Sequence, residues 1–271
     1  MKKYRSYFIY ASFFILISIG IEYEFSAYAN GELTFKQYQL IGSSVLLLLF
    51  YILPLAYLLR YWQREWRLPK HLLAFAIMSG CLVAGWTSAL GNDLASSLLS
   101  PLFSNQAFFT DWEASLTAPF IEEPLKLLAA LFALYFFKRR SARAAFIAGA
   151  GSGLGFQISE DISYAYTTAL DTPSSTIADT FARLSGFLSS HWMMSSLVTL
   201  GCIWIFFSHS KRTRIRGIAL CLLTVMFHFI WNSPYTGIET PFSIHVAILS
   251  GLYCLLFYIT YQKLQANQPI N

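Results

Sequence analysis

Charged residues are scarce in this sequence: Asp, Glu, Lys and Arg make up 12% of its 271 residues, whereas hydrophobic residues make up 56%. A soluble domain has about 25% charged residues, so the deficit indicates a membrane protein. Cysteine is also sparse. The four cysteines lie in separate apolar segments, and they form no C-x-x-C motif or Cys/His cluster. Neither a disulfide framework nor a zinc finger is supported.

Long apolar segments recur along the whole chain, and a helix needs about 20 apolar residues to cross a bilayer. We therefore predict an all-α polytopic membrane protein with about eight transmembrane helices in one bundle. No linker divides residues 1–271, which form a single integral membrane domain. Residues 92–114 are too polar to span and are predicted to lie on or dip into the surface. The predicted spans are 7–25, 40–60, 71–91, 115–137, 143–165, 184–208, 217–233 and 242–261.

The net charge of +5 follows the predicted topology. Of the 19 basic residues, 16 lie at the start of the chain, in alternate loops or at Lys263, while Lys36 and Arg183 lie in the other set of loops. By the positive-inside rule, both termini and the basic loops are cytoplasmic. The basic charge is thus explained by orientation in the membrane, and we expect no nucleic-acid partner.

A few ionisable residues remain inside the predicted spans, where each costs on the order of 3 kcal/mol at mid-bilayer. They are Glu122, Glu123, Lys126, Glu160, Asp161, His191 and His228. At about 1.5 Å per residue, those on four different spans all lie roughly 8–10 Å below the outer surface. This shared depth predicts one site in the extracytoplasmic half of the bilayer.

Local spacing agrees with a common site, although structural roles are also possible. Lys126 follows Glu122 by four residues and Glu123 by three, so one ammonium can pair with either carboxylate on a helix. Asn232 follows His228 by one helical turn and shares its face. The structural alternatives are an ion-pair cluster that ties helices together, histidines that only bond between helices, and an Asn232 that ends a helix.

Four ordered motifs resemble those of the PrsW family of intramembrane proteases, a group related to the CAAX prenyl endopeptidases and Abi-type proteins. The motifs are E-E-x-x-K at 122–126, F-x-x-x-E at 156–160, a lone His191 and H-x-x-x-N at 228–232. The resemblance covers about residues 115 to 235, the predicted catalytic core. One departure is Asp161, where family members often have Asn; it adds a carboxylate to the site or faces away.

The resemblance implies a protease of bacterial or archaeal cell membranes that cuts a membrane-anchored protein, for example a single-span regulator. It implies Glu122 and Glu123 as the catalytic acid pair, with Glu160, His191 and His228 completing the site.

Two chemical designs and one rival function remain open. In one design a glutamate is the general base with His191, and His228 and Asn232 donate hydrogen bonds to the oxyanion, with Lys126 and Asp161 in support. In the other, Glu122, His191 and His228 hold Zn²⁺. The rival is a proton- or ion-coupled transporter that uses the buried Glu/Lys/His cluster.

Overall fold

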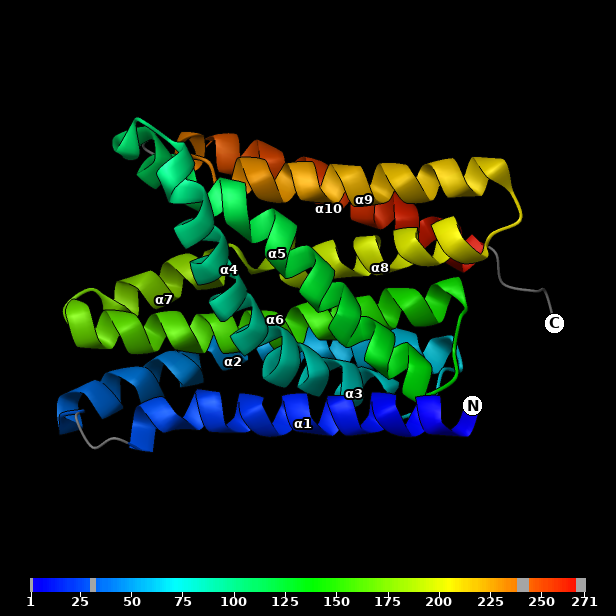
Figure 1. The fold of residues 1–271 in the computed structure, drawn as a ribbon, viewed down its shortest axis with the longest axis horizontal. Helices are drawn as coiled ribbons and strands as arrows, with labels where there is room; N and C mark the ends of the chain where they lie inside the picture. Colours follow the sequence, from blue (N-terminus) through cyan, green and yellow to red (C-terminus); the bar gives the residue numbers. More distant parts are fainter. Residues whose placement is uncertain (1, 30–32, 238–243, 267–271) are drawn as a thin grey trace.

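Helices account for most of the chain in the computed structural model, which describes residues 2–29, 33–237 and 244–266 (Figure 1). No strand occurs among these residues. Polar side chains start several helices: Thr34 forms a capping box with Gln37, and Ser141 accepts from the Ala144 N–H. The helices are α1 (Lys2–Ala29), α2 (Phe35–Glu65), α3 (Leu72–Ser79), α4 (Gly85–Leu99), α5 (Gln106–Phe136), α6 (Ala142–Asp171), α7 (Thr176–Ser185), α8 (His191–Phe207), α9 (Lys211–Trp231) and α10 (Ile244–Ala266).

Six of the described helical stretches are long and apolar enough to cross a membrane. They are Ser6–Ser26, Phe35–Glu65, Leu72–Leu102, Phe187–Phe207, Lys211–Trp231 and Ile244–Ala266. The predicted count of eight is not confirmed, because α5 and α6 are not among them. Both have the length, with 31 and 30 residues. Their composition is less apolar because charged residues such as Glu122, Lys126 and Asp161, and many glycine and small polar residues, are buried in the protein.

The segment 92–114, which was predicted not to span and to lie on or dip into the surface, is mostly helical and forms the end of α4 and the start of α5. A π-helical turn, Gly80–Ala84, joins α3 to α4, so the third helical stretch continues to Leu99 and a short 3₁₀ turn. The next helix, α5, begins at Gln106, where the Asn105 side chain caps it by accepting from the Phe108 N–H. Several polar residues of this segment, such as Asn92 and Asp93, line a cavity. The polarity of this segment therefore reflects its place in the wall of the cavity.

The helices alternate in direction, so the start of α1 and the end of α10 lie at the same end of the bundle (Figure 1). The connections between α2 and α3, between α5 and α6 and between α8 and α9 lie at that end as well. These are the basic loops of the sequence. The alternation of loops deduced from charge therefore agrees with the fold.

Alternating glycines let α6 lie at the centre of the bundle. Gly149 and Gly153 face α8, where an added Cβ would collide with the backbone of Ser195 and of His191. Gly151 and Gly155 face α3, where an added Cβ would collide with the Ala76 side chain and with the Ile77 backbone. Small residues at this spacing allow helix backbones to approach closely. Neighbouring helices thus approach α6 closely on two of its faces.

The aromatic core occupies the half of the bundle near the basic loops. Trp62 of α2, Phe146 of α6 and Phe257 of α10 pack together there, with Phe146 and Phe257 ring centroids 4.9 Å apart. Phe146 begins α6 and Phe257 lies late in α10, which fixes this cluster at the end where the termini meet. The opposite half contains a cavity of about 760 Å³.

Candidate active site

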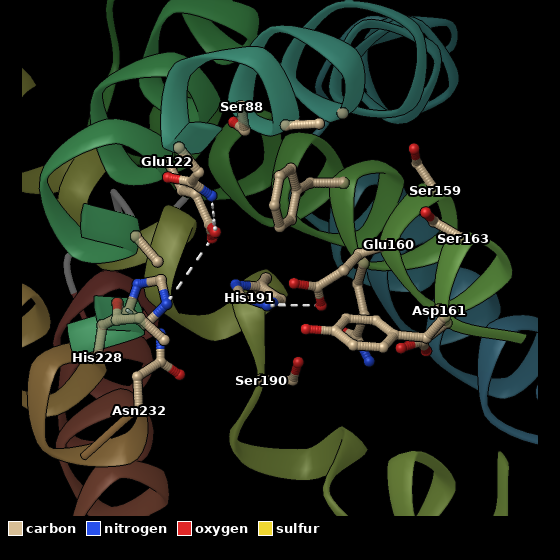
Figure 2. Close-up of a pocket in the computed structure, with 18 of the residues that line it drawn as sticks. Ser88, Glu122, Ser159, Glu160, Asp161, Ser163, Ser190, His191, His228 and Asn232 are labelled. Atoms are coloured by element: carbon tan, nitrogen blue, oxygen red, sulfur yellow. Dashed lines mark hydrogen bonds and ion pairs between the residues drawn. The ribbon is translucent and has the colours of Figure 1, made fainter. Parts of the chain in front are cut away.

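A polar cavity of about 760 Å³ lies between α1, α4, α5, α6, α7, α8 and α9. Six carboxylate residues line it: Glu24, Asp93, Glu113, Glu122, Glu160 and Asp161. Figure 2 shows Glu122, His191 and His228 on one side of this space and Glu160 next to His191. Most candidate residues of the sequence thus meet at one cavity.

The two adjacent glutamates of α5 occupy different places. Glu122 lines the cavity, whereas Glu123 lies behind it and is 1% exposed. Lys126, also fully buried, joins them: its Nζ lies 2.7 Å from Glu123 Oε1 and 3.4 Å from Glu122 Oε2. Consecutive helical residues point about 100° apart, so only one of the two can face the cavity directly. The carboxylate pair is therefore one cavity-facing group and one buried partner.

His228 of α9 is held by the buried glutamate. Its Nδ1 lies 3.0 Å from Glu123 Oε1, and its Nε2 lies 3.7 Å from Glu122 Oε2. Because an ionised carboxylate only accepts hydrogen bonds, the His228 Nδ1–H donates to Glu123. In the neutral ring, Nε2 then presents a lone pair toward Glu122. Two acceptors face each other at the cavity wall.

His191 is the first residue of α8, so this helix begins later in the sequence than the span start predicted at residue 184. Gly153 allows the His191 backbone to approach α6, which brings the ring beside that of Phe156, with centroids 4.8 Å apart. The His191 ring lies 5.4 Å from that of His228. Its Nδ1 is 2.8 Å from Lys126 Nζ, and its Nε2 is 3.2 Å from Glu160 Oε2. An ammonium only donates, so Nδ1 accepts and the Nε2–H donates to Glu160.

Glu160 and Asp161 are both tied to Arg183, which reaches in from α7. The Arg183 Nη2 lies 2.5 Å from Glu160 Oε2, and its Nε donates to Asp161 Oδ1. Tyr51 of α2 donates to the other Asp161 oxygen at 2.7 Å. Burial alone would lower the pKa of the Arg183 guanidinium, but these two carboxylates raise it above its usual value. Arg183 therefore stays charged, and Asp161 is the buried anchor that holds it.

The two asparagines of the cavity wall differ in what they touch. Asn232 caps the end of α9, as its structural alternative predicted, and its side-chain amide donates to the Ala114 carbonyl at 3.4 Å. This is a long hydrogen bond, and the side chain lines the cavity. Asn92 of α4 donates to Glu122 Oε1 at 3.0 Å. Asn92 thus orients the cavity-facing glutamate.

Comparison with known families decides what kind of protein contains this site. The PrsW family of intramembrane metalloproteases matches residues 68–261, which cover the cavity helices from α4 to α9. The chain belongs to this family. Comparisons with curated proteins and with solved structures gave no match. The protein is accordingly an intramembrane protease in an integral membrane fold, and the wider relationship to CAAX endopeptidases stays a prediction.

The donor set of this protease fits a zinc ion. Glu122, His191 and His228 each offer one ligand atom, and these atoms lie within 4.8 Å of one another. One carboxylate and two imidazoles match catalytic zinc sites, which leave a fourth position open. His228 also has the carboxylate partner on its second nitrogen that zinc-binding histidines usually have, here Glu123.

His191 offers zinc either ring nitrogen, and in both cases its contacts must change. Ligation through Nδ1 displaces the Lys126 ammonium, which lies 2.8 Å from that nitrogen. Ligation through Nε2 requires that nitrogen to lose its proton and Nδ1 to carry one. The Lys126 ammonium must then keep only its contacts with Glu122 and Glu123. Metal binding commonly releases or moves protons in this way.

Sequence reasoning missed three residues of the site: Arg183, Asn92 and Tyr51. Arg183 left a signal, since it is one of two basic residues in the loops that otherwise lack them. Asn92 lay in the segment that was assigned to the surface. Tyr51 left no signal, because it is one of 16 tyrosines and the only mark of its role is contact with Asp161, 110 residues away.

Proposed function

We propose that this protease hydrolyses a peptide bond of a membrane-anchored protein, for example a single-span regulator, with Glu122, His191 and His228 around the scissile bond. The observation that carries the proposal is the meeting of these three side chains, from α5, α8 and α9, at one cavity wall. The cavity volume of about 760 Å³ lies within the roughly 300–1,000 Å³ typical of ligand sites.

The chain's own groups can supply the proton transfers of hydrolysis. Glu122 and His228 face each other as acceptors 3.7 Å apart, so a water that donates to both is polarised for attack. The group that takes the proton of this water, Glu122 or His228, then returns it to the leaving amine, and His191, with its Nε2–H toward Glu160, lies beside them. Asn232 offers the side-chain amide that we assign to the developing oxyanion.

Zinc is the finer part of the proposal. Bound by Glu122, His191 and His228, zinc would lower the pKa of its water toward about 7 and polarise the scissile carbonyl. Glu160, which lines the cavity beside His191 and is not a ligand in this design, is the carboxylate that we assign to accept the proton of the attacking water. In either design, Glu123 and Lys126 lie behind the site. Glu123 orients His228, and Lys126 pairs with Glu122 and keeps its carboxylate ionised.

We also propose that the site faces the extracytoplasmic half of the membrane, with both termini in the cytoplasm. His191 begins α8 and His228 lies near the end of α9, while the loop that joins these helices at the other end is basic. Basic loops remain cytoplasmic as a rule. Cleavage is therefore expected near the extracytoplasmic end of the substrate helix.

A transporter built on the same buried charges is the alternative, and no observation on the described residues favours it. The deciding experiment uses purified protein in liposomes with a single-span substrate. We expect wild type to cleave and to contain about one zinc per chain, and Glu122→Gln to do neither. Mass spectrometry of the products locates the cut. If wild type moves ions across the liposome membrane and cleaves nothing, the transporter replaces this proposal.

A further inference from the structure

Two cysteines from neighbouring helices meet between α8 and α9, which run side by side in the bundle (Figure 1). The Sγ atoms of Cys202 and Cys221 lie 4.0 Å apart, and Cys221 Sγ also lies 3.7 Å from the Val198 carbonyl oxygen. The other two cysteines, Cys81 and Cys254, lie on different elements of the fold. The mechanism proposed above uses neither thiol of the pair.

Two glycines bring the backbones of α8 and α9 together next to this pair. An added Cβ on Gly201 would lie 2.7 Å from the Gly217 carbonyl oxygen, and one on Gly217 would lie 2.6 Å from the Gly201 carbonyl oxygen. Small residues allow such close approach of helices in membranes. A disulfide needs its sulfur atoms at about 2.05 Å. Since the backbones already touch here, rotation of the two cysteine side chains can close the remaining gap.

The cysteine pair lies at a seam that faces lipid. Both thiols are half-buried, and three large apolar side chains next to them on the same helices are exposed: Phe206, Ile218 and Leu222. Neither cysteine lines the cavity that contains Glu122. The reductants that keep cytoplasmic thiols reduced act from water. A reagent that reaches this pair therefore comes from the bilayer.

We propose that Cys202 and Cys221 form a redox modification site, at which a hydroperoxide dissolved in the bilayer converts the two thiols into a disulfide. One sulfur attacks the terminal oxygen of the hydroperoxide, the O–O bond breaks, and a sulfenic acid forms. The alcohol leaves with the proton of that thiol. The second sulfur then displaces the sulfenic oxygen, which leaves as water with the second thiol proton. The two sulfurs are oxidised by two electrons, and the O–O bond is reduced by two.

The disulfide fixes α8 against α9 without touching the candidate active site. At 1.5 Å per residue, Cys202 lies roughly 16 Å along α8 from His191, and Cys221 lies roughly 10 Å along α9 from His228. The cross-link thus holds together the two helices that supply these histidines. It also closes the connection between them into a loop, which restricts the unfolded chain.

The test is oxidation of the protein in liposomes, followed by mass spectrometry of its peptides. Wild type is compared with a variant in which Cys81 and Cys254 are replaced by alanine, so that only the pair remains. The bilayer-soluble probe is cumene hydroperoxide. The matched control carries Cys221→Ala and Leu222→Cys in that variant, which turns the second thiol by about 100° around α9, toward lipid.

We expect wild type and the two-cysteine variant to give one peptide pair joined through Cys202 and Cys221, which dithiothreitol separates. The control should form no bond within one chain. Hydrogen peroxide at the same concentration should act about tenfold more slowly, because it does not concentrate in the apolar layer. Two free thiols after treatment of wild type, or a control that cross-links as fast, would overturn the modification site. Equal rates with the two peroxides would overturn the route through the bilayer.

Thermal unfolding gives a second readout of the cross-link. The oxidised two-cysteine variant should unfold roughly 5 °C above its reduced form, and dithiothreitol should reverse the shift. The control should show no shift. A complete cross-link without any rise in the unfolding temperature would show that the disulfide does not fix α8 against α9. Neither measurement requires cleavage, so the result is independent of the proposed function.

Discussion

Two consecutive acidic pairs, Glu122–Glu123 on α5 and Glu160–Asp161 on α6, meet at the cavity, and they are built alike. In each pair the first member is the more exposed to the cavity, with 6% and 23% of its side chain exposed, and the second is almost fully buried. In each pair a cation bridges both carboxylates. The two pairs differ in which residue supplies the cation and in where that residue lies in the chain.

The α5 pair is local and the α6 pair is assembled from distant parts of the chain. Lys126 comes from the same helix, three and four residues further along. Arg183 comes from α7, and Tyr51 comes from α2, outside the residues matched by the family. A second contact, from Thr180 to Ser44 at 2.8 Å, fixes α7 against α2. The α6 pair therefore depends on the packing of a short helix, and the α5 pair does not.

Glu122→Gln is expected to have the largest effect. The amide keeps the shape of the carboxylate and some of its hydrogen bonds, but it cannot take a proton from water and is a poor metal ligand. We expect cleavage to fall about 10³-fold with insertion and thermal stability retained. Glu65→Gln, at the exposed end of α2, is the control and should cleave like wild type. Normal turnover by Glu122→Gln would remove this residue from the chemistry.

Glu123→Gln separates the two members of the α5 pair. Because Glu123 lies behind His228 and does not line the cavity, its loss should misorient that ring and weaken metal retention. Carboxylate partners of this kind are typically worth about 10–100-fold. We expect that loss in cleavage, with a parallel loss of bound zinc on dialysis against a chelator. A variant as inactive as Glu122→Gln, with zinc fully retained, would contradict the division of roles.

Arg183→Ala tests the cation of the α6 pair. It leaves Glu160 and Asp161 as neighbouring buried charges, so Glu160 loses its position beside His191. We expect cleavage to fall about tenfold, in line with one charged hydrogen bond of about 1.5 kcal/mol. Arg183→Lys should recover only part of the activity, since lysine lacks the planar fork that contacts both carboxylates.

Lys36→Ala is the control, as the other basic residue in that set of loops and an exposed one. If both substitutions change cleavage equally, Arg183 acts through general surface charge and not through Glu160.

The sequence predicts much of this because buried charge is rare in membrane spans. Glu122, Glu160, His191 and His228 stand out against an apolar background, and their common depth is enough to expect them together. Which glutamate faces the cavity is not readable, since the answer depends on how α5 is rotated within the bundle. The number of spans is also not readable from composition, since α5 and α6 are polar where protein surrounds them.

Long-range partners are the part that the sequence hides. Asp161 was expected to add a carboxylate to the site or to face away: it lines the cavity, and it also anchors Arg183 beside Glu160. Nothing local specifies a pairing across 22 residues, or one across 110 residues to Tyr51. Such contacts arise only when α2, α6 and α7 pack, so they require the fold.

Tyr51→Phe is expected to have the smallest effect and tests the outermost link of the α6 pair. Phenylalanine keeps the ring, which stacks on Phe187 with centroids 5.6 Å apart, and removes only the hydroxyl that donates to Asp161 Oδ2. Asp161 then still holds Arg183, but more loosely, so we expect a two- to fivefold fall in kcat/KM, about the value of one hydrogen bond.

Tyr253→Phe is the matched control: both tyrosines are 1% exposed, but the Tyr253 hydroxyl lies beside Thr224, away from the cavity. It should leave kcat/KM unchanged. In the Arg183→Ala background, Tyr51→Phe should add little, because the link it supports is already gone. Full additivity of the two substitutions would show that Tyr51 acts on packing and not through Asp161 and Arg183.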